Sequence, residues 1–121
     1  MHDYEQLFRD SSHAYEERDI EKAMSFVTED YSWFKMTDDG ADLRSKGKEQ
    51  ASFGLKMVFE SEDYVKGEVA FLKAFGNIVV AYEEDQYREG DGFVTRGTLG
   101  VYKYKDGKLS RVYSFSVDDD G

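Results

Sequence analysis

The chain has 121 residues and a net charge of −10, and it contains no cysteine and no proline. This charge argues against nucleic acid and anionic membranes as partners, because both are bound through clustered lysine and arginine. The lack of cysteine excludes disulfide scaffolds and thiolate metal sites, and it fits a cytoplasmic location. Nine Phe, nine Tyr and one Trp can build the core of a single folded domain over residues 1–121.

The first half of the chain has the apolar spacing of helices. Residues 3–18 place apolar side chains three and four positions apart, which predicts an amphipathic helix. Asp19 is a typical N-cap and predicts a second, short helix directly after it. Residues 48–60 predict a third helix with apolar side chains on two faces. Between them we expect a strand over residues 31–36 and a polar loop over residues 37–45.

The second half of the chain alternates with the period of two that is typical of strands. We expect four successive strands over residues 64–75, 78–89, 93–105 and 108–117. The junctions Gly76-Asn77, Gly90-Asp91-Gly92 and Asp106-Gly107 are short hairpin turns, so the strands form an antiparallel meander. Strands this long must twist and curl. A curled sheet with three helices on its concave side makes a cone, and an open cone can hold a pocket.

The hairpin turns allow the register to be predicted. If Asp91 forms the tip of its hairpin, Glu84 faces Thr98 and Gln86 faces Arg96. The face expected to line the cone then carries Val69, Phe71, Val80, Tyr82, Glu84, Gln86, Arg96 and Thr98. A slip of one residue in either turn would exchange the two faces of the sheet. For the last hairpin two alternatives stay open, with either Tyr113 and Phe115 or Val112, Ser114 and Ser116 on the pocket face.

The candidate ligand-binding residues combine this pocket face with side chains from the helices and the first strand. They are Tyr15, Trp33, Phe53, Met57, Phe71, Tyr82, Glu84, Gln86, Arg96 and Thr98. Glu84 is the candidate base, and Arg96 and Tyr82 are the orienting groups, because a buried glutamate beside an arginine can act with a shifted pKa. The alternative is a structural ion pair among packed aromatic rings. No metal site is expected, since Asp38-Asp39-Gly40 lacks the ligand spacing of a calcium loop.

Three segments carry a resemblance to a known superfamily. They are Arg18-Asp19-Ile20 with the following Phe26–Trp33, Gly47–Ala51 at the start of the third helix, and Val101–Leu109 across the last hairpin. Together they resemble the nuclear transport factor 2-like superfamily, in its SnoaL-like and ketosteroid-isomerase-like branch. The resemblance implies an α+β fold in which a curved antiparallel sheet packs against three helices to form a cone.

The resemblance also implies an assembly and a type of activity. It implies a homodimer through the outer sheet face, with Leu99, Val101, Val79 and Ala81 at its apolar centre. It further implies a pocket for a small molecule, and we expect neither a metal nor an organic cofactor in it. A surface charge of −10 repels anions, so a neutral or weakly polar ligand is expected.

The catalytic residues of the resembling enzymes are replaced in this chain. The tyrosine and two aspartates of ketosteroid isomerase fall on Ser11, Lys35 and Gly100. The Arg-x-Asp pattern of limonene epoxide hydrolase becomes Arg96-x-Thr98, where Glu84 is expected to supply the missing carboxylate. Two functions therefore stay open. One is a cofactor-independent isomerase, lyase or hydrolase, and the other is a non-catalytic ligand-binding or dimerisation module.

Overall fold

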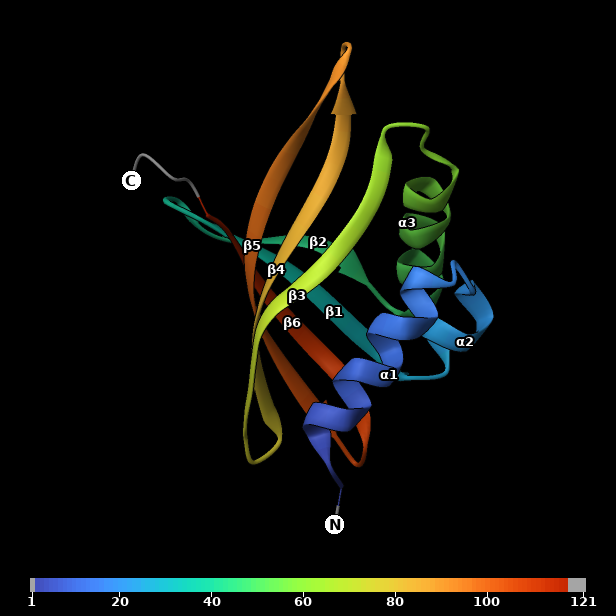
Figure 1. Ribbon diagram of the computed structural model, residues 1–121. Coiled ribbons are helices and arrows are strands. Elements are labelled where there is room, and N and C mark those ends of the chain that lie inside the picture. Colours follow the sequence, from blue (N-terminus) through green and yellow to red (C-terminus); the bar gives the residue numbers. More distant parts are fainter. Residues whose placement is uncertain (1, 118–121) are drawn as a thin grey trace.

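Three helices cover one face of a six-stranded sheet in the computed structural model, which describes residues 2–117 (Figure 1). The helices are α1 (Tyr4–Glu16), α2 (Ile20–Met24) and α3 (Lys48–Glu60), and the strands are β1 (Val27–Thr37), β2 (Gly40–Lys46), β3 (Tyr64–Phe75), β4 (Ile78–Glu89), β5 (Gly92–Lys105) and β6 (Lys108–Val117). The predicted α+β class, with a curved sheet against three helices, is confirmed.

The helices begin where the sequence offers a cap. The Asp3 carboxylate accepts a hydrogen bond from the backbone N–H of Gln6 at the start of α1, and Asp19 accepts one from Lys22 at the start of α2. Such side-chain acceptors satisfy backbone donors that the first helical turn leaves free. The predicted cap at Asp19 is therefore confirmed.

The strands are arranged in the order β2-β1-β6-β5-β4-β3. The predicted meander of β3 to β6 is confirmed, and β6 also pairs with β1 in parallel. The loop expected over residues 37–45 is wrong, because most of it forms the edge strand β2, paired with β1. This strand is exposed on both faces except at Ser45, so it lacks the apolar alternation that identifies a strand in sequence.

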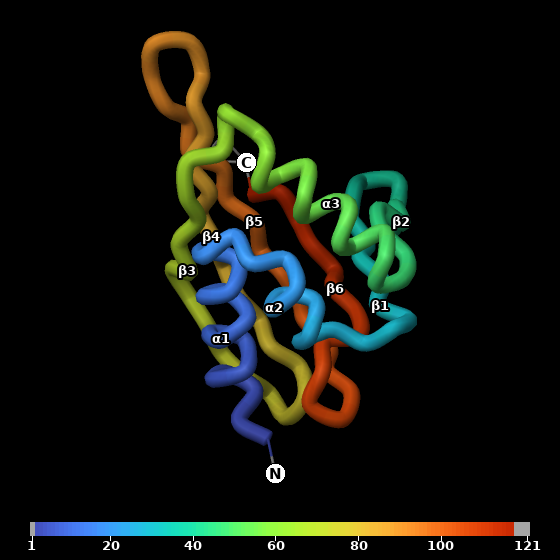
Figure 2. Tube along the Cα trace, turned by 90° about the vertical axis from the view of Figure 1, so that its right-hand side faces the viewer, coloured from blue at the N-terminus to red at the C-terminus, as the bar shows by residue number. Residues whose placement is uncertain are grey.

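The helices lie on the concave face of the sheet. α1 contacts β3 and β4, while α3 contacts β1 and β2, and Figure 2 shows the two helices toward opposite edges of this one face. The core between α1 and the sheet contains the buried residues Phe8, Val79, Ala81 and Tyr104. Val79 and Ala81 have no exposed surface, so their expected place in an outer dimer face is wrong.

The register of the β4–β5 hairpin differs by one residue from the prediction. Glu89 pairs with Gly92, so the turn is a two-residue turn formed by Gly90 and Asp91 rather than a loop centred on Asp91. Gly90 has a φ of +61°, which suits a tight hairpin. As a result Glu84 faces Gly97, not Thr98. Because of this difference of one residue, the even-numbered side chains of β4, which were expected to face the cone, lie on the outer face.

The last hairpin decides between the two sets of side chains considered above. It starts as a two-residue turn with Lys105 opposite Lys108, and the register then shifts by one residue between Lys103 and Tyr104. Val112 and Ser114 are buried on the concave face, and Tyr113 lies on the outer face, stacked on Phe34. The Val112, Ser114 and Ser116 set therefore faces the helices.

Candidate functional site

Two carboxyl groups and four tyrosines gather on the concave face near the end of α1. We call this group the acid–tyrosine cluster, and it consists of Glu83, Asp85, Tyr15, Tyr64, Tyr87 and Tyr102. The ring centroid of Tyr64 lies 6.0 Å from that of Tyr15 and 5.6 Å from that of Tyr87. The Tyr102 hydroxyl donates a hydrogen bond to Glu83 Oε2 over 3.3 Å. The cluster thus joins helix α1 to strands β3, β4 and β5.

Glu83 is the titratable group of this cluster that is tuned toward neutral pH. Burial raises its pKa to about 7, and the nearby carboxylate of Asp85 acts in the same direction. The hydrogen bond from Tyr102 opposes this rise, because it stabilises the charged form. The pKa of Asp85 is also raised by burial. Near pH 7 the Glu83 carboxyl is therefore present in both its protonated and its charged form.

The tyrosines of the cluster remain protonated at any ordinary pH. Burial, followed by the negative charge of Asp85, raises the pKa of Tyr64 to about 12. Burial also raises the pKa of Tyr15 and of Tyr102 well above the usual range. These hydroxyls are therefore neutral hydrogen-bond donors beside the two carboxyl groups.

Two glycines make room for the cluster. A Cβ atom on Gly100 would lie 2.5–2.7 Å from the ring and hydroxyl of Tyr102, so only glycine lets this ring lie across β5 toward Glu83. A Cβ atom on Gly67 would lie 2.5 Å from Asp85 Oδ1, and Gly67 is the register partner of Asp85. Each close approach fits the role of glycine inside strands.

Two arginines lie at the edge of the cluster. The guanidinium of Arg18 is 5.6 Å from the ring centroid of Tyr64, and that of Arg96 is 5.5 Å from the ring centroid of Tyr87. Within residues 2–117, no ion pair joins Glu83 or Asp85 to a basic side chain. The Glu83 carboxyl is therefore held by the Tyr102 hydroxyl, and within the described residues neither carboxyl group is paired with a cation.

Trp33 also lies on the concave face, but on β1, which β6 and β5 separate from β4. Its indole N–H donates a hydrogen bond to the buried Ser114 hydroxyl over 2.7 Å, and its side chain is still 37% exposed. Ser45 is its register partner on β2 and is buried. The Ser45 hydroxyl has no hydrogen-bond partner among the described residues.

The structure separates the candidate site residues into three groups. Tyr15, Trp33, Arg96 and Thr98 lie on the concave side, where Arg96 faces Asp85 and Thr98 faces Glu83. Successive side chains of β4 point to opposite faces of the sheet, and Val79 and Ala81 are buried on the concave face. The outer face therefore carries Tyr82, Glu84 and Gln86, together with Phe71, the register partner of Tyr82. Phe53 and Met57 are 65% and 58% exposed on α3. The predicted pairing of Glu84 with Thr98 is therefore wrong, because Glu83 is the register partner of Thr98.

Two of the positions that match the catalytic residues of ketosteroid isomerase, Ser11 and Gly100, have structural roles. The Ser11 hydroxyl bonds back to the Phe8 carbonyl of its own helix, and Gly100 provides space for Tyr102. His13 is exposed, and its ring nitrogens lie 3.7 Å from a Glu16 oxygen and 3.5 Å from a Glu17 oxygen. The sequence offered one signal for the acid–tyrosine cluster, because Gly67 and Gly100 make room for Asp85 and Tyr102.

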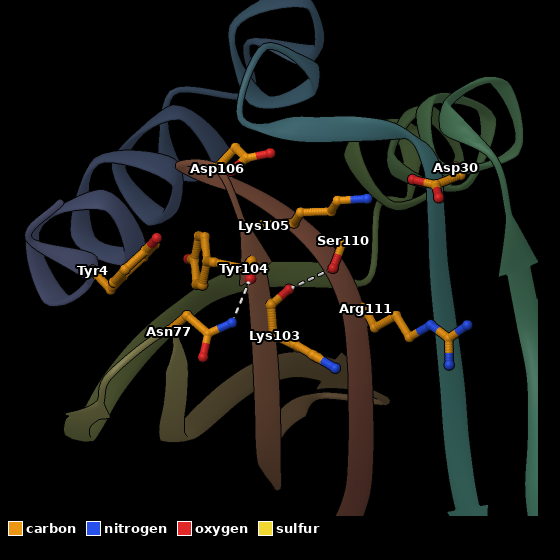
Figure 3. Close-up of a pocket in the computed structure, with 9 residues that line it drawn as sticks. All are labelled: Tyr4, Asp30, Asn77, Lys103, Tyr104, Lys105, Asp106, Ser110 and Arg111. Carbon is orange, nitrogen blue, oxygen red and sulfur yellow. Dashed lines mark hydrogen bonds between the residues drawn. The ribbon is translucent and has the colours of Figure 1, made fainter. Parts of the chain in front are cut away.

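Two cavities lie away from the acid–tyrosine cluster. One, of about 630 Å³, opens near the β5–β6 turn, and Figure 3 shows it between Tyr4 and Tyr104 on one side and Arg111 on the other. It also holds Lys103 and Lys105, whose side chains are exposed. A second, of about 940 Å³, runs between α2 and α3 and includes Phe53.

Neither a metal centre nor a membrane span is found in the part of the chain that the structure describes. Over residues 2–117, no three His, Asp or Glu side chains are grouped so that they could hold a metal ion. No helix there has the length and apolar character needed to cross a bilayer.

No family model and no curated protein sequence matches the chain, but solved structures do. An NTF2-like protein of unknown function from Cytophaga hutchinsonii is 15% identical, with a TM-score of 0.75 over 97% of this chain and 92% of its own. A putative ketosteroid isomerase from Kribbella flavida is 17% identical, with a TM-score of 0.75 over 95% and 78%. An LEH-like epoxide hydrolase from M. tuberculosis is 14% identical, with a TM-score of 0.74 over 94% and 82%. At such identities the likeness concerns the fold and not the activity. The chain thus has the fold of the nuclear transport factor 2-like superfamily, as its sequence resemblance implied.

Proposed function

We propose that the chain is a cofactor-independent enzyme of the isomerase, lyase or hydrolase kind that acts on a small neutral or weakly polar molecule. The molecule binds against the concave face, and Glu83 transfers a proton to or from it. The observation that carries this proposal is the partly buried Glu83 carboxyl, which accepts a hydrogen bond from Tyr102 and whose pKa is raised by burial to about 7.

The environment of Glu83 suits general acid–base catalysis. A catalytic group works best when its pKa is close to the working pH, because both protonation states are then populated. The Tyr102 hydroxyl holds one carboxylate oxygen and fixes its direction. The neutral hydroxyls of Tyr15 and Tyr64 supply donors for an oxygen that gains negative charge.

The charge of the site supports a ligand without negative charge. Glu83 and Asp85 already repel each other, and an anion beside them would add to this repulsion. The net charge of −10 acts in the same direction over the whole surface. The absence of cysteine from the sequence fits action in the cytoplasm.

The proposal is tested with a matched pair of variants. Glu83→Gln removes the proposed base, and Glu84→Gln makes the same change one residue away on the outer face. Native mass spectrometry reports any co-purified molecule, and a thermal-shift screen of small carbonyl compounds reports new ligands. Deuterium uptake from heavy water into a bound carbonyl compound then measures proton transfer. We expect uptake with the Glu84→Gln variant and none with Glu83→Gln, and equal uptake by both would contradict the proposal.

The outer face of the sheet favours a second role, as a dimerisation module. Leu99 and Val101 lie there with Phe71, Phe75 and Phe115, which are 54%, 62% and 40% exposed. An apolar face of this kind is typical of a protein interface. A homodimer through this face predicts that Leu99→Lys gives monomers in light scattering while the ligand screen stays unchanged. Wild-type protein that is monomeric at all concentrations would exclude this role.

A further inference from the structure

We propose that the cavity near the β5–β6 turn binds the phosphate group of a small phosphate monoester. The cavity has a volume of about 630 Å³, which is in the range of pockets that hold small molecules. Three basic side chains, those of Lys103, Lys105 and Arg111, line it. No residue of the acid–tyrosine cluster does, so this site is separate from the one in the proposed function.

Two pairs of like charges face each other across the β5–β6 hairpin. Lys105 is the register partner of Lys108, and Lys103 is the register partner of Arg111. Like charges directly opposite each other destabilise an antiparallel pair of strands. Among residues 2–117, none of these four side chains has a carboxylate oxygen within 4.0 Å. A dianion bound beside them would offset the repulsion that the hairpin otherwise retains.

A β-bulge brings Arg111 opposite Lys103. A regular ladder beyond Leu109 would place Ser110 opposite Lys103. The register instead shifts by one residue, and the Ser110 hydroxyl donates a hydrogen bond to the Lys103 carbonyl over 3.0 Å. Bulges often re-aim a side chain next to a functional site. Here the bulge gives Lys103 a second cation as its neighbour in place of a neutral serine.

The three basic side chains of the cavity extend to the same side of the hairpin, away from the Tyr104 ring (Figure 3). Along β5, Lys103 and Lys105 alternate with the buried Tyr104. On β6, Arg111 directly precedes the buried Val112. All three cations therefore lie on the outer face of the sheet. A guanidinium can hold two oxygens of one phosphate group, and neighbouring ammonium groups add positive charge.

Two carboxylates also line the cavity, but they do not neutralise it. Asp30 accepts a hydrogen bond from Thr28 over 2.7 Å, which is the largest cause of its lowered pKa, and the charges of Lys105 and Arg111 add to this effect. Asp106 lies in the turn itself. The three cations outnumber these two carboxylates, although the whole chain has a net charge of −10. A large polyanion would meet the surrounding negative surface, so the cavity suits a small ligand.

The proposal is tested with glycerol 3-phosphate, glycerol and malonate. Glycerol lacks the phosphate group, and malonate is a dicarboxylate with the same charge as the phosphate monoester. Amide chemical shifts of isotope-labelled protein are followed at pH 7.5 in low salt, where the phosphate monoester is a dianion. We expect saturable shifts at residues 103–111 with glycerol 3-phosphate and none with glycerol. Malonate should bind at least about threefold more weakly, because it cannot match the fork of the guanidinium as phosphate does.

A matched pair of variants locates the site. Lys103→Gln should weaken the binding of glycerol 3-phosphate by about tenfold, because it removes one charge-assisted contact. Lys66→Gln makes the same change at an exposed lysine of β3 outside the cavity, and the affinity should stay within about twofold. Without ligand, Lys103→Gln should unfold at a higher temperature than Lys66→Gln, because it relieves the repulsion from Arg111.

Four outcomes would overturn the proposal. They are the lack of saturable binding, tighter binding of malonate than of glycerol 3-phosphate, equal affinities of the two variants, and a lower unfolding temperature for Lys103→Gln than for Lys66→Gln. The proposed function is judged separately, because it depends on deuterium uptake that requires Glu83 on the concave face. Either idea can therefore fail while the other stands.

Discussion

Glu83 makes the stability of the fold depend on pH in a direction opposite to that of most carboxyl groups. Its pKa rises from 4.5 to about 7 on folding, chiefly because of burial. The folded chain therefore holds this proton more tightly than the unfolded chain. The stability contributed is fully present below pH 4.5 and is lost as the pH rises through 7. At about 1.4 kcal/mol per pKa unit, the loss amounts to about 3 kcal/mol.

Glu83→Gln should remove this loss, because glutamine is uncharged at every pH and has nearly the same shape. At pH 5 the wild-type protein should have lost only about 1 kcal/mol, so the two free energies of unfolding should lie within about 1 kcal/mol of each other. At pH 8.5 the variant should be more stable by as much as about 3 kcal/mol. Urea unfolding from pH 5 to pH 8.5, followed by circular dichroism, measures both profiles.

Glu84→Gln is the control, since Glu84 is exposed and lies on the outer face. Its stability should follow the wild-type profile. The reasoning is refuted if the Glu83→Gln variant loses stability with pH as steeply as the wild-type protein. It is also refuted if Glu84→Gln is the variant whose profile becomes flat.

Further substitutions test the packing that positions the site. Gly100→Ala should lower the free energy of unfolding by about 1–3 kcal/mol, because the new methyl group overlaps the ring that crosses β5. Gly54→Ala should raise it by about 0.5–1 kcal/mol, since nothing lies within 4 Å of that position on α3. Ser114→Ala should cost about 1–3 kcal/mol, because it leaves the Trp33 indole N–H without its acceptor. Ser45→Ala should instead stabilise the fold by about 1 kcal/mol, as it removes a buried hydroxyl without a partner. Each value follows from urea unfolding, and a sign opposite to the one given would contradict the packing described.

The four strands β3 to β6 could be predicted closely from sequence, because a glycine marks every turn between them. The ends of β3, β4 and β6 agree with the prediction, and β5 starts one residue earlier. β2 could not be predicted in this way, since it is an exposed edge strand and its stability comes from pairing with β1.

The predicted pocket face was wrong because the predicted register of the β4–β5 hairpin differed by one residue from the observed one. The sequence Gly90-Asp91-Gly92 allows both a two-residue and a three-residue loop, and these place opposite faces of β4 on the helices. Local sequence does not distinguish the two loops. Packing does, because α1 buries the small pair Val79 and Ala81 and leaves the larger Tyr82 outside.

The place of β6 between β1 and β5 also determines the order in which the chain can fold. β6 is synthesised after the other five described strands, yet β1 and β2 join the rest of the sheet only through it. The early β1–β2 hairpin must therefore wait for β6, and pairing over so long a separation slows folding. Trp33, the only tryptophan, lies at this junction and bonds to Ser114, 81 residues away. Its fluorescence should report the last step of assembly rather than the first.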